Sequence, residues 1–176
     1  MIKKLKWLSL LFVMLSAFLV GCGDLTKLKK GETFLQEKSQ YSIPEGKSTI
    51  EIISDNQWKY TDNKDGKSSV YDVRETKFKA GTFKVLTVTK SNDYSENDLW
   101  NVRTGKQYVI GLHEGGFSLV KVGLVDRHGV TDWEYGNSGY KKGRNFEEDY
   151  EEAKDKEAFL KDIADHANLK YKKINS

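Results

Sequence analysis

Between residues 41 and 135, hydrophobic and polar residues alternate with a period of two, and this alternation limits the possible folds more than any other feature. Ile50 and Ile52 alternate with polar neighbours, as do Thr131, Trp133 and Tyr135. Successive side chains of a β-strand point to opposite faces of a sheet, so the pattern is typical of strands with one buried and one solvated face. The region is therefore predicted to form strands rather than helices.

Two segments of this region, Phe83–Val88 and Phe117–Val125, are hydrophobic at most positions. This is typical of central strands that are covered on both faces. Clusters rich in glycine, asparagine and aspartate separate the strands, at 62–66, 104–106, 114–116 and 127–129. Short loops of this composition connect antiparallel hairpins. We therefore predict a mainly β fold, a single antiparallel β-sandwich or small barrel of about 7–8 strands with a C-terminal α-helix.

The predicted helix begins at Asn145. Asparagine is a favourable N-cap, and the acidic residues that follow it suit the positive end of the helix dipole. Asp155 is a candidate second N-cap, so we expect the helix to break near it. Leu169–Tyr171 are expected to add a short last strand.

The first 22 residues have the order of a secretory signal, a basic start followed by an apolar stretch. The apolar stretch runs from Trp7 to Val20. It is about fourteen residues long, whereas a membrane-spanning helix needs roughly twenty. The stretch ends in a run of four residues, Leu19, Val20, Gly21 and Cys22. This run resembles the lipobox of bacterial membrane lipoproteins.

The resemblance implies cleavage between Gly21 and Cys22 and attachment of diacylglycerol, with palmitate-type acyl chains, to the cysteine thiol. Two acyl chains anchor a protein stably, whereas one holds it only marginally. The alternative is an ordinary secretory signal, after which the chain's single cysteine would remain as a free thiol outside the cell. The lysine-rich, arginine-poor composition favours a Gram-positive source. The expected location is the extracytoplasmic face of the cell membrane.

The chain is accordingly divided into a cleaved signal peptide (1–21), a lipidated flexible tether (22–40) and a β-rich extracytoplasmic domain with a C-terminal helix (41–176). Lys27, Lys29 and Lys30 of the tether suit either contact with anionic headgroups or simple solvation. Residues 1–21 hold three of the 29 basic residues and no acidic ones, so 26 basic and 26 acidic residues remain after cleavage. A net charge of zero gives no electrostatic reason to expect nucleic-acid binding.

Motifs that carry catalytic or metal chemistry are weak in this sequence. Asn63, Asp65, Gly66 and Asp72 only partly match a calcium loop, and a solvated hairpin turn explains them better. The three histidines occur at predicted turns and on the helix, where surface positions without a metal are expected. The sequence contains no nucleophile elbow, phosphate loop or zinc motif. We therefore expect no catalytic residues, no metal and no cofactor.

The many aromatic residues are mostly expected in the core, and those in polar segments are the candidates for exposure. Tyr94 and Trp100 in the segment around 91–98, and Tyr140 in a basic loop, are therefore candidate ligand-binding residues. The sequence favours a non-enzymatic, lipid-anchored module that binds a peptide, protein or cell-wall ligand, for example as an immunity lipoprotein does. The alternatives are a cell-envelope hydrolase and a structural or assembly lipoprotein.

Overall fold

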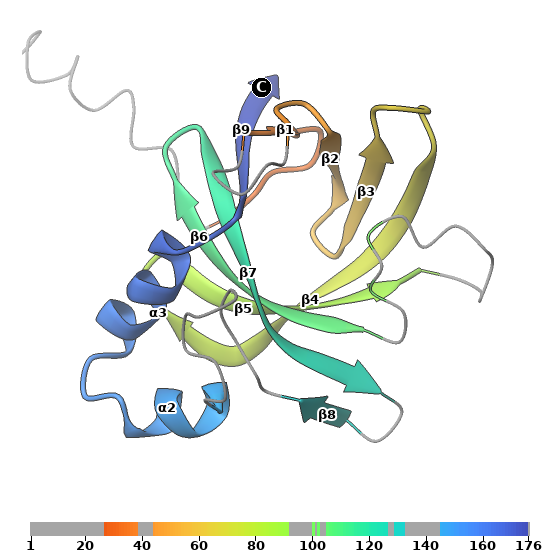
Figure 1. Cartoon of the computed structure of the whole chain (residues 1–176). Helices are drawn as coiled ribbons and strands as arrows, with labels where there is room; N and C mark the ends of the chain where they lie inside the picture. Colours follow the sequence, from red (N-terminus) through yellow and green to blue (C-terminus); the bar gives the residue numbers. More distant parts are fainter. Residues whose placement is uncertain are drawn as a thin grey trace, which may run out of the picture.

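The computed structural model describes residues 27–38, 44–91, 100, 102, 105–126, 129–132 and 145–175, with the backbone alone described over 124–132. These ranges contain nine strands and two helices (Figure 1). The strands are β1 (Thr33–Gln36), β2 (Ser48–Ser54), β3 (Gln57–Asp62), β4 (Ser68–Ala80), β5 (Phe83–Lys90), β6 (Lys106–His113), β7 (Gly116–Asp126), β8 (Gly129–Asp132) and β9 (Leu169–Asn175). The helices are α2 (Phe146–Glu152) and α3 (Lys156–Asp165).

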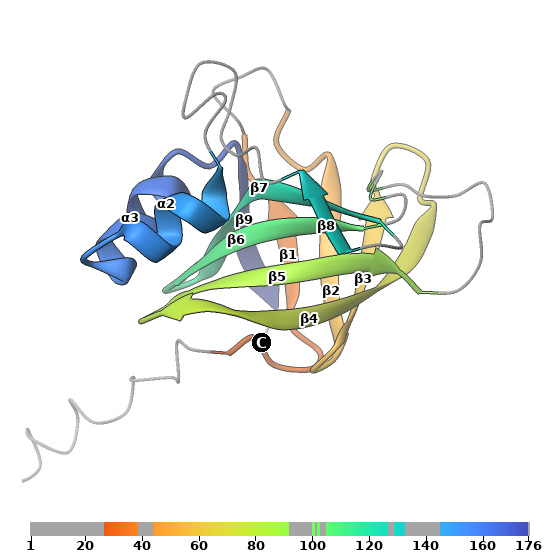
Figure 2. The ribbon, with the colours of Figure 1, turned by 90° about the horizontal axis from the view of Figure 1, so that it is seen from below.

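Eight of these strands close into an antiparallel barrel, which confirms the predicted fold class. Strands β1 to β7 pair in chain order, and β9 lies between β7 and β1 and completes the cylinder. Phe34 of β1, for example, is opposite Ile50 of β2 on one side and Lys173 of β9 on the other. Strand β8 pairs with β7 outside the closed ring. Figure 2 shows the barrel turned by 90°, with α2 and α3 together on one side of it.

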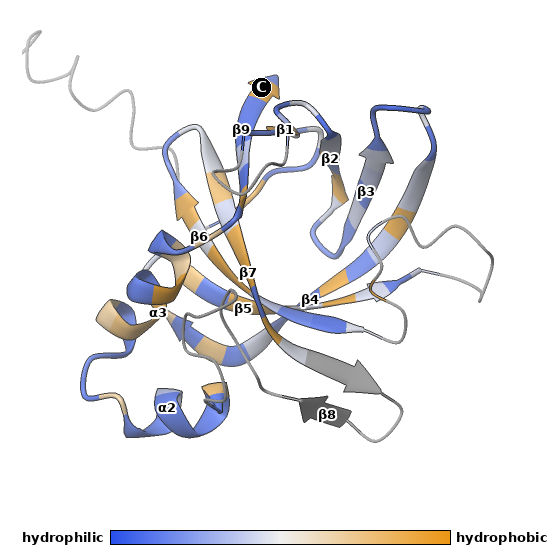
Figure 3. Cartoon of the chain, viewed as in Figure 1, coloured by the Kyte–Doolittle hydropathy of each residue, from blue (hydrophilic) through white to orange (hydrophobic). Residues whose placement is uncertain are grey.

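The barrel interior is filled by hydrophobic side chains, as expected for an eight-stranded barrel of this size. Figure 3 shows hydrophobic and hydrophilic residues alternating along strands such as β4. Phe117 and Tyr171, both almost fully buried, stack with ring centroids 5.1 Å apart, and Phe34 meets Phe117 edge-on at 4.9 Å. The interior cluster also includes Ile50, Ile52, Trp58, Tyr71, Val73, Leu86, Val88, Tyr108, Ile110 and Leu119.

A second hydrophobic cluster lies between the helices and the outer wall of the barrel. Val85, Val109 and Val120 point outward from β5, β6 and β7, against Leu160 and Ile163 of α3. This explains why the segments 83–88 and 117–122 are hydrophobic on both faces. Their inner residues fill the barrel and their outer residues are covered by helix.

The predicted helix caps are both present, and the predicted break separates α2 from α3. The Asn145 side chain accepts hydrogen bonds from the backbone N–H groups of Glu147 and Glu148. The Asp155 side chain accepts one from Ala158. The expected last strand is longer than predicted, since β9 extends to Asn175.

The prediction of a flexible tether over residues 22–40 is wrong for its second half. Residues 33–36 form β1, and Phe34 is only 2% exposed. Sequence patterns do not reveal this strand, because β1 is only four residues long and has a single large apolar side chain in the interior. The lysine-rich sequence around it is also typical of a solvated linker. Pairing with β2 and β9 on its two sides fixes it in the barrel.

Tyr171 belongs to a buried polar cluster inside the barrel. Its hydroxyl lies 3.1 Å from the Ser48 hydroxyl, which donates to the Gln36 side-chain carbonyl at 2.6 Å. Gln36 Nε2 has no partner among the described residues. Burial raises the pKa of Tyr171 far above the ordinary value of 10.0, and this effect outweighs the opposing contact with Ser48.

We expect the free energy of unfolding to fall as the pH rises above 10. The unfolded chain loses the Tyr171 proton near pH 10, whereas the folded chain retains it, so the stabilisation is complete below that pH and declines above it. For one group the decline is at most about 1.4 kcal/mol per pH unit. Urea unfolding at successive pH values measures it. Tyr171→Phe should reduce the slope, and an unchanged slope would contradict this origin.

Candidate functional site

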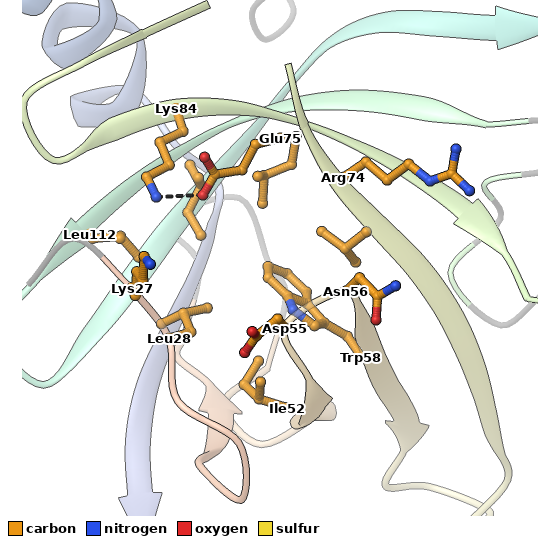
Figure 4. A pocket seen from close by; sticks show the side chains of 13 residues that line it. Lys27, Leu28, Ile52, Asp55, Asn56, Trp58, Arg74, Glu75, Lys84 and Leu112 are labelled. Atoms are coloured by element: carbon orange, nitrogen blue, oxygen red, sulfur yellow. Dashed lines mark hydrogen bonds and ion pairs between the residues drawn. The ribbon is translucent and has the colours of Figure 1, made fainter. Parts of the chain in front are cut away.

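A pocket of about 480 Å³ opens at one end of the barrel. We call this end, which contains the β2–β3 turn (Asp55, Asn56) and the β6–β7 turn (Glu114, Gly115), the mouth. Figure 4 shows the side chains that line the pocket, which come from strands β2 to β6, from the β2–β3 turn and from the segment before β1. They are Lys27, Leu28, Ile52, Asp55, Asn56, Trp58, Val73, Arg74, Glu75, Lys84, Leu86, Ile110 and Leu112.

The walls of the pocket are apolar. Seven lining side chains belong to hydrophobic residues, and six of these are buried members of the barrel interior, namely Ile52, Trp58, Val73, Leu86, Ile110 and Leu112. Leu28 packs against the same cluster from the chain before β1. The pocket is therefore the part of the barrel interior that the protein's own side chains leave unfilled at the mouth.

Charged side chains occupy the rim, and an ion pair between Lys84 and Glu75 is the best-defined contact there. Lys84 Nζ lies 2.5 Å from Glu75 Oε1, and the Lys84 side chain is only 12% exposed (Figure 4). A register shift between Glu75 and Lys79 interrupts the pairing of β4 with β5. Such irregularities redirect side chains. Here Phe78 faces the outer cluster, while Glu75 lines the pocket.

The segment from Lys27 to Glu32 lies along the mouth and is bound to the barrel through its backbone. Gly31 N–H donates to the Ile52 carbonyl at 2.8 Å, and Ile52 N–H donates to the Glu32 carbonyl at 2.9 Å. A second, smaller pocket of about 170 Å³ shares Lys27, Leu28 and Leu112 with the first and is also lined by His113 and Lys173. The segment before β1 thus contributes to both pockets.

Glu32 holds this segment in place electrostatically. Its carboxylate accepts hydrogen bonds from the Lys29 N–H at 2.8 Å and from Lys173 Nζ at 2.9 Å. Partial burial raises the pKa of Glu32, but these two contacts outweigh it and hold the pKa below its ordinary value. The carboxylate is thus charged at neutral pH and fixes the segment to β9.

The candidate ligand-binding residues named from the sequence do not form the site. Trp100 is 8% exposed and stacks inside the barrel, so the expectation that it is exposed is wrong. Its polar neighbours in sequence are misleading, because the side chain enters the interior from the β5–β6 connection. Tyr94 and Tyr140 lie outside the described residues, as do the lipobox residues Leu19, Val20, Gly21 and Cys22.

The residues considered for calcium have other partners. Asn63 accepts a hydrogen bond from Thr49, Asp65 accepts from the Lys67 N–H, and Asp72 accepts from Gln57 in the next strand. In the described part of the chain, no group of three or more histidine, cysteine or acidic side chains is arranged to hold a metal. Neither helix within the described ranges has the length and hydrophobicity needed to span a bilayer.

The pocket has no direct signal in the sequence, because its lining comes from segments separated by up to 85 positions, from Lys27 to Leu112. The apolar residues Leu28 and Phe34 within the predicted tether were the available clue. A pocket with apolar walls and a charged rim suits a ligand that has an apolar part and a polar group.

Comparison with known proteins adds one relative of unknown function. The chain is 28% identical over 182 residues to an uncharacterized protein of Bacillus anthracis, covering 99% of this chain and all of that protein. No protein-family model matches the chain, and no solved structure shows significant similarity to it.

Proposed function

We propose that this protein is a lipid-anchored binding module on the outer face of the cell membrane, and that the mouth pocket binds the apolar part of a peptide or envelope ligand. The observation that carries the binding role is the apolar pocket of about 480 Å³. Its size falls within the range of about 300–1,000 Å³ that is usual for small-ligand sites. The proposed location is inferred from the lipobox-like run of residues 19–22.

Two features of the site support ligand binding over a purely structural role. The unfilled volume lies between buried side chains of the core, where close packing is the rule. Lys84 and Glu75 form an ion pair at its rim. Either side chain can leave this pair and bind a polar group of the ligand that carries the opposite charge. The ligand binds reversibly in this pocket and undergoes no chemical reaction.

Cys22→Ala should release the exported protein from the membrane fraction into the medium. The substitution removes the thiol that would carry two acyl chains, each of whose buried methylene groups contributes about 0.8 kcal/mol of membrane affinity. Immunoblots of membrane and medium measure the distribution, and Ser176→Ala serves as the control. If the Cys22→Ala protein stays in the membrane, or if native protein shows no lipid by intact mass, the location is wrong.

Leu112→Trp should abolish binding of an apolar fluorescent probe, anilinonaphthalene sulfonate, at the mouth. Leu112 lines the pocket, and the larger side chain has unfilled space to occupy. The variant should therefore keep its stability, whereas overpacking a filled core costs about 1–3 kcal/mol. Lys59→Trp on β3 introduces the same side chain away from the pocket and should leave probe binding unchanged. Equal binding to both variants would place the probe elsewhere and contradict the pocket.

A further inference from the structure

Ile174 is the one strongly exposed large hydrophobic residue among the described residues, with 54% of its surface accessible. It lies near the end of β9, at the mouth of the barrel. The neighbouring Asn175 accepts a hydrogen bond from the Thr33 N–H at 2.5 Å and donates one to the Gly31 carbonyl at 3.4 Å. The end of β9 therefore lies against Gly31 and Thr33, at the end of the barrel where the segment 27–32 leads into β1. Figure 2 shows this end of the chain beneath the barrel.

Exposed basic side chains also occur at this end of the barrel, in the segment before β1. Lys27, Lys29 and Lys30 are exposed, and within the described ranges none of their ammonium groups has a carboxylate at salt-bridge distance. Lys173 is neutralised by Glu32. Among the residues that line the two pockets, five are lysine or arginine and three are acidic. The basic residues are Lys27, Lys29, Arg74, Lys84 and Lys173, and the acidic ones are Glu32, Asp55 and Glu75.

The proposed lipid attachment site is close to the same end in sequence. Lys27 follows Cys22 by only five positions. A fully extended chain of that length spans at most about 18 Å, so the backbone of Cys22 cannot lie farther than this from Lys27 at the mouth. The opposite end of the barrel, with the β3–β4 turn around Lys64, carries no such constraint.

We propose that the Ile174 side of the mouth rests on an anionic phospholipid bilayer, so that the binding pocket opens toward the membrane surface. This inference rests on the lipidation of Cys22 in the proposed function. Each lysine near an anionic surface contributes about 1 kcal/mol, and the Ile174 side chain adds apolar contact with the interface. The ligand then reaches the pocket from the membrane interface, which identifies it as an amphiphile that partitions into lipid.

Orientation on the membrane is testable because lipidation blocks the natural thiol. In the lipidated full-length mature protein, Ile174→Cys introduces a single free thiol for an environment-sensitive fluorophore. Lys64→Cys, in the exposed β3–β4 turn, is the matched control at the opposite end. Both are reconstituted in vesicles of phosphatidylcholine with phosphatidylglycerol, and quenching by nitroxide-labelled lipid is measured.

We expect the fluorophore at 174 to be quenched severalfold more strongly than the one at 64. Lys29→Glu combined with Lys30→Glu should remove most of this difference, and so should vesicles of phosphatidylcholine alone. Equal, weak quenching at both positions would overturn the inference, as would protection of position 174 by dimer formation in cross-linking. Intact mass of the same samples separates the two failures, because protein without lipid contradicts the proposed function and lipidated protein without quenching contradicts only the orientation.

Discussion

Replacement of Trp100 by alanine is expected to lower the free energy of unfolding by about 4 kcal/mol. The indole stacks with Tyr60 and with Tyr108, each at a centroid distance of 5.6 Å, and meets Tyr71 edge-on at 5.5 Å. Its backbone N–H donates to the Tyr71 hydroxyl at 2.8 Å. Trp58 stacks on the indole as well, at 6.3 Å, so alanine would leave a cavity where four aromatic strand residues now meet.

Urea unfolding monitored by circular dichroism measures this loss. Ile174→Ala is the control, because an exposed hydrophobic side chain away from special contacts should change stability by no more than about 0.5 kcal/mol. A loss of less than about 1 kcal/mol for Trp100→Ala would mean that the indole is not part of the core. It would also restore Trp100 as a candidate for ligand contact.

Gly116→Ala is expected to destabilise the protein by about 3 kcal/mol, since it forces an overpacked contact that cannot relax through a side chain. Gly116 is the first residue of β7 and is opposite Lys172 of β9. A Cβ atom at this position would overlap the backbone carbonyl oxygen of Tyr171. The overlap can be removed only if β9 moves away from β7, and this movement breaks the pairing of β7 with β9 that helps to close the barrel.

The adjacent Gly115 provides a matched control for this substitution. Gly115 has a φ of +78°, and a Cβ atom added there would have no neighbouring atom within 4 Å. Gly115→Ala therefore meets only backbone strain of about 1–2 kcal/mol. Thermal or urea unfolding of both variants gives the comparison. If Gly115→Ala costs as much as Gly116→Ala, the close approach of β7 and β9 is not the cause.

The fold class was predictable because the barrel depends on local signals that survive in the sequence. The alternation at Ile50 and Ile52, the turn at Glu114–Gly115 and the two N-caps all appear where they were expected. The apolar outer residues of β5 and β7 were detected as well. The sequence did not predict that helices α2 and α3 cover these residues, because the sequence of a strand does not specify whether a helix or a sheet packs against it.

The closure of the barrel and the site depend on contacts that local patterns do not encode. Strand β1 is fixed by pairing with β2 and with β9, and β9 is separated from it by more than 130 residues. Trp100 occupies a polar stretch of sequence but fills the interior. The pocket exists because side chains from several strands fail to fill one end of the barrel, and such a deficit of volume has no signature at any single position.

The pairing of β9 with β1 also has a consequence for the order of folding. The Thr33 N–H donates to a side chain 142 positions away, and the seam at which the cylinder closes consists of the first and last strands described. Contacts of such long sequence separation slow folding, because much chain must be ordered before they form. A nascent chain that lacks residues 169–175 would present β1 and β7 as two unpaired edges, which are templates for aggregation. Synthesis must therefore proceed through β9 before the native state can be completed.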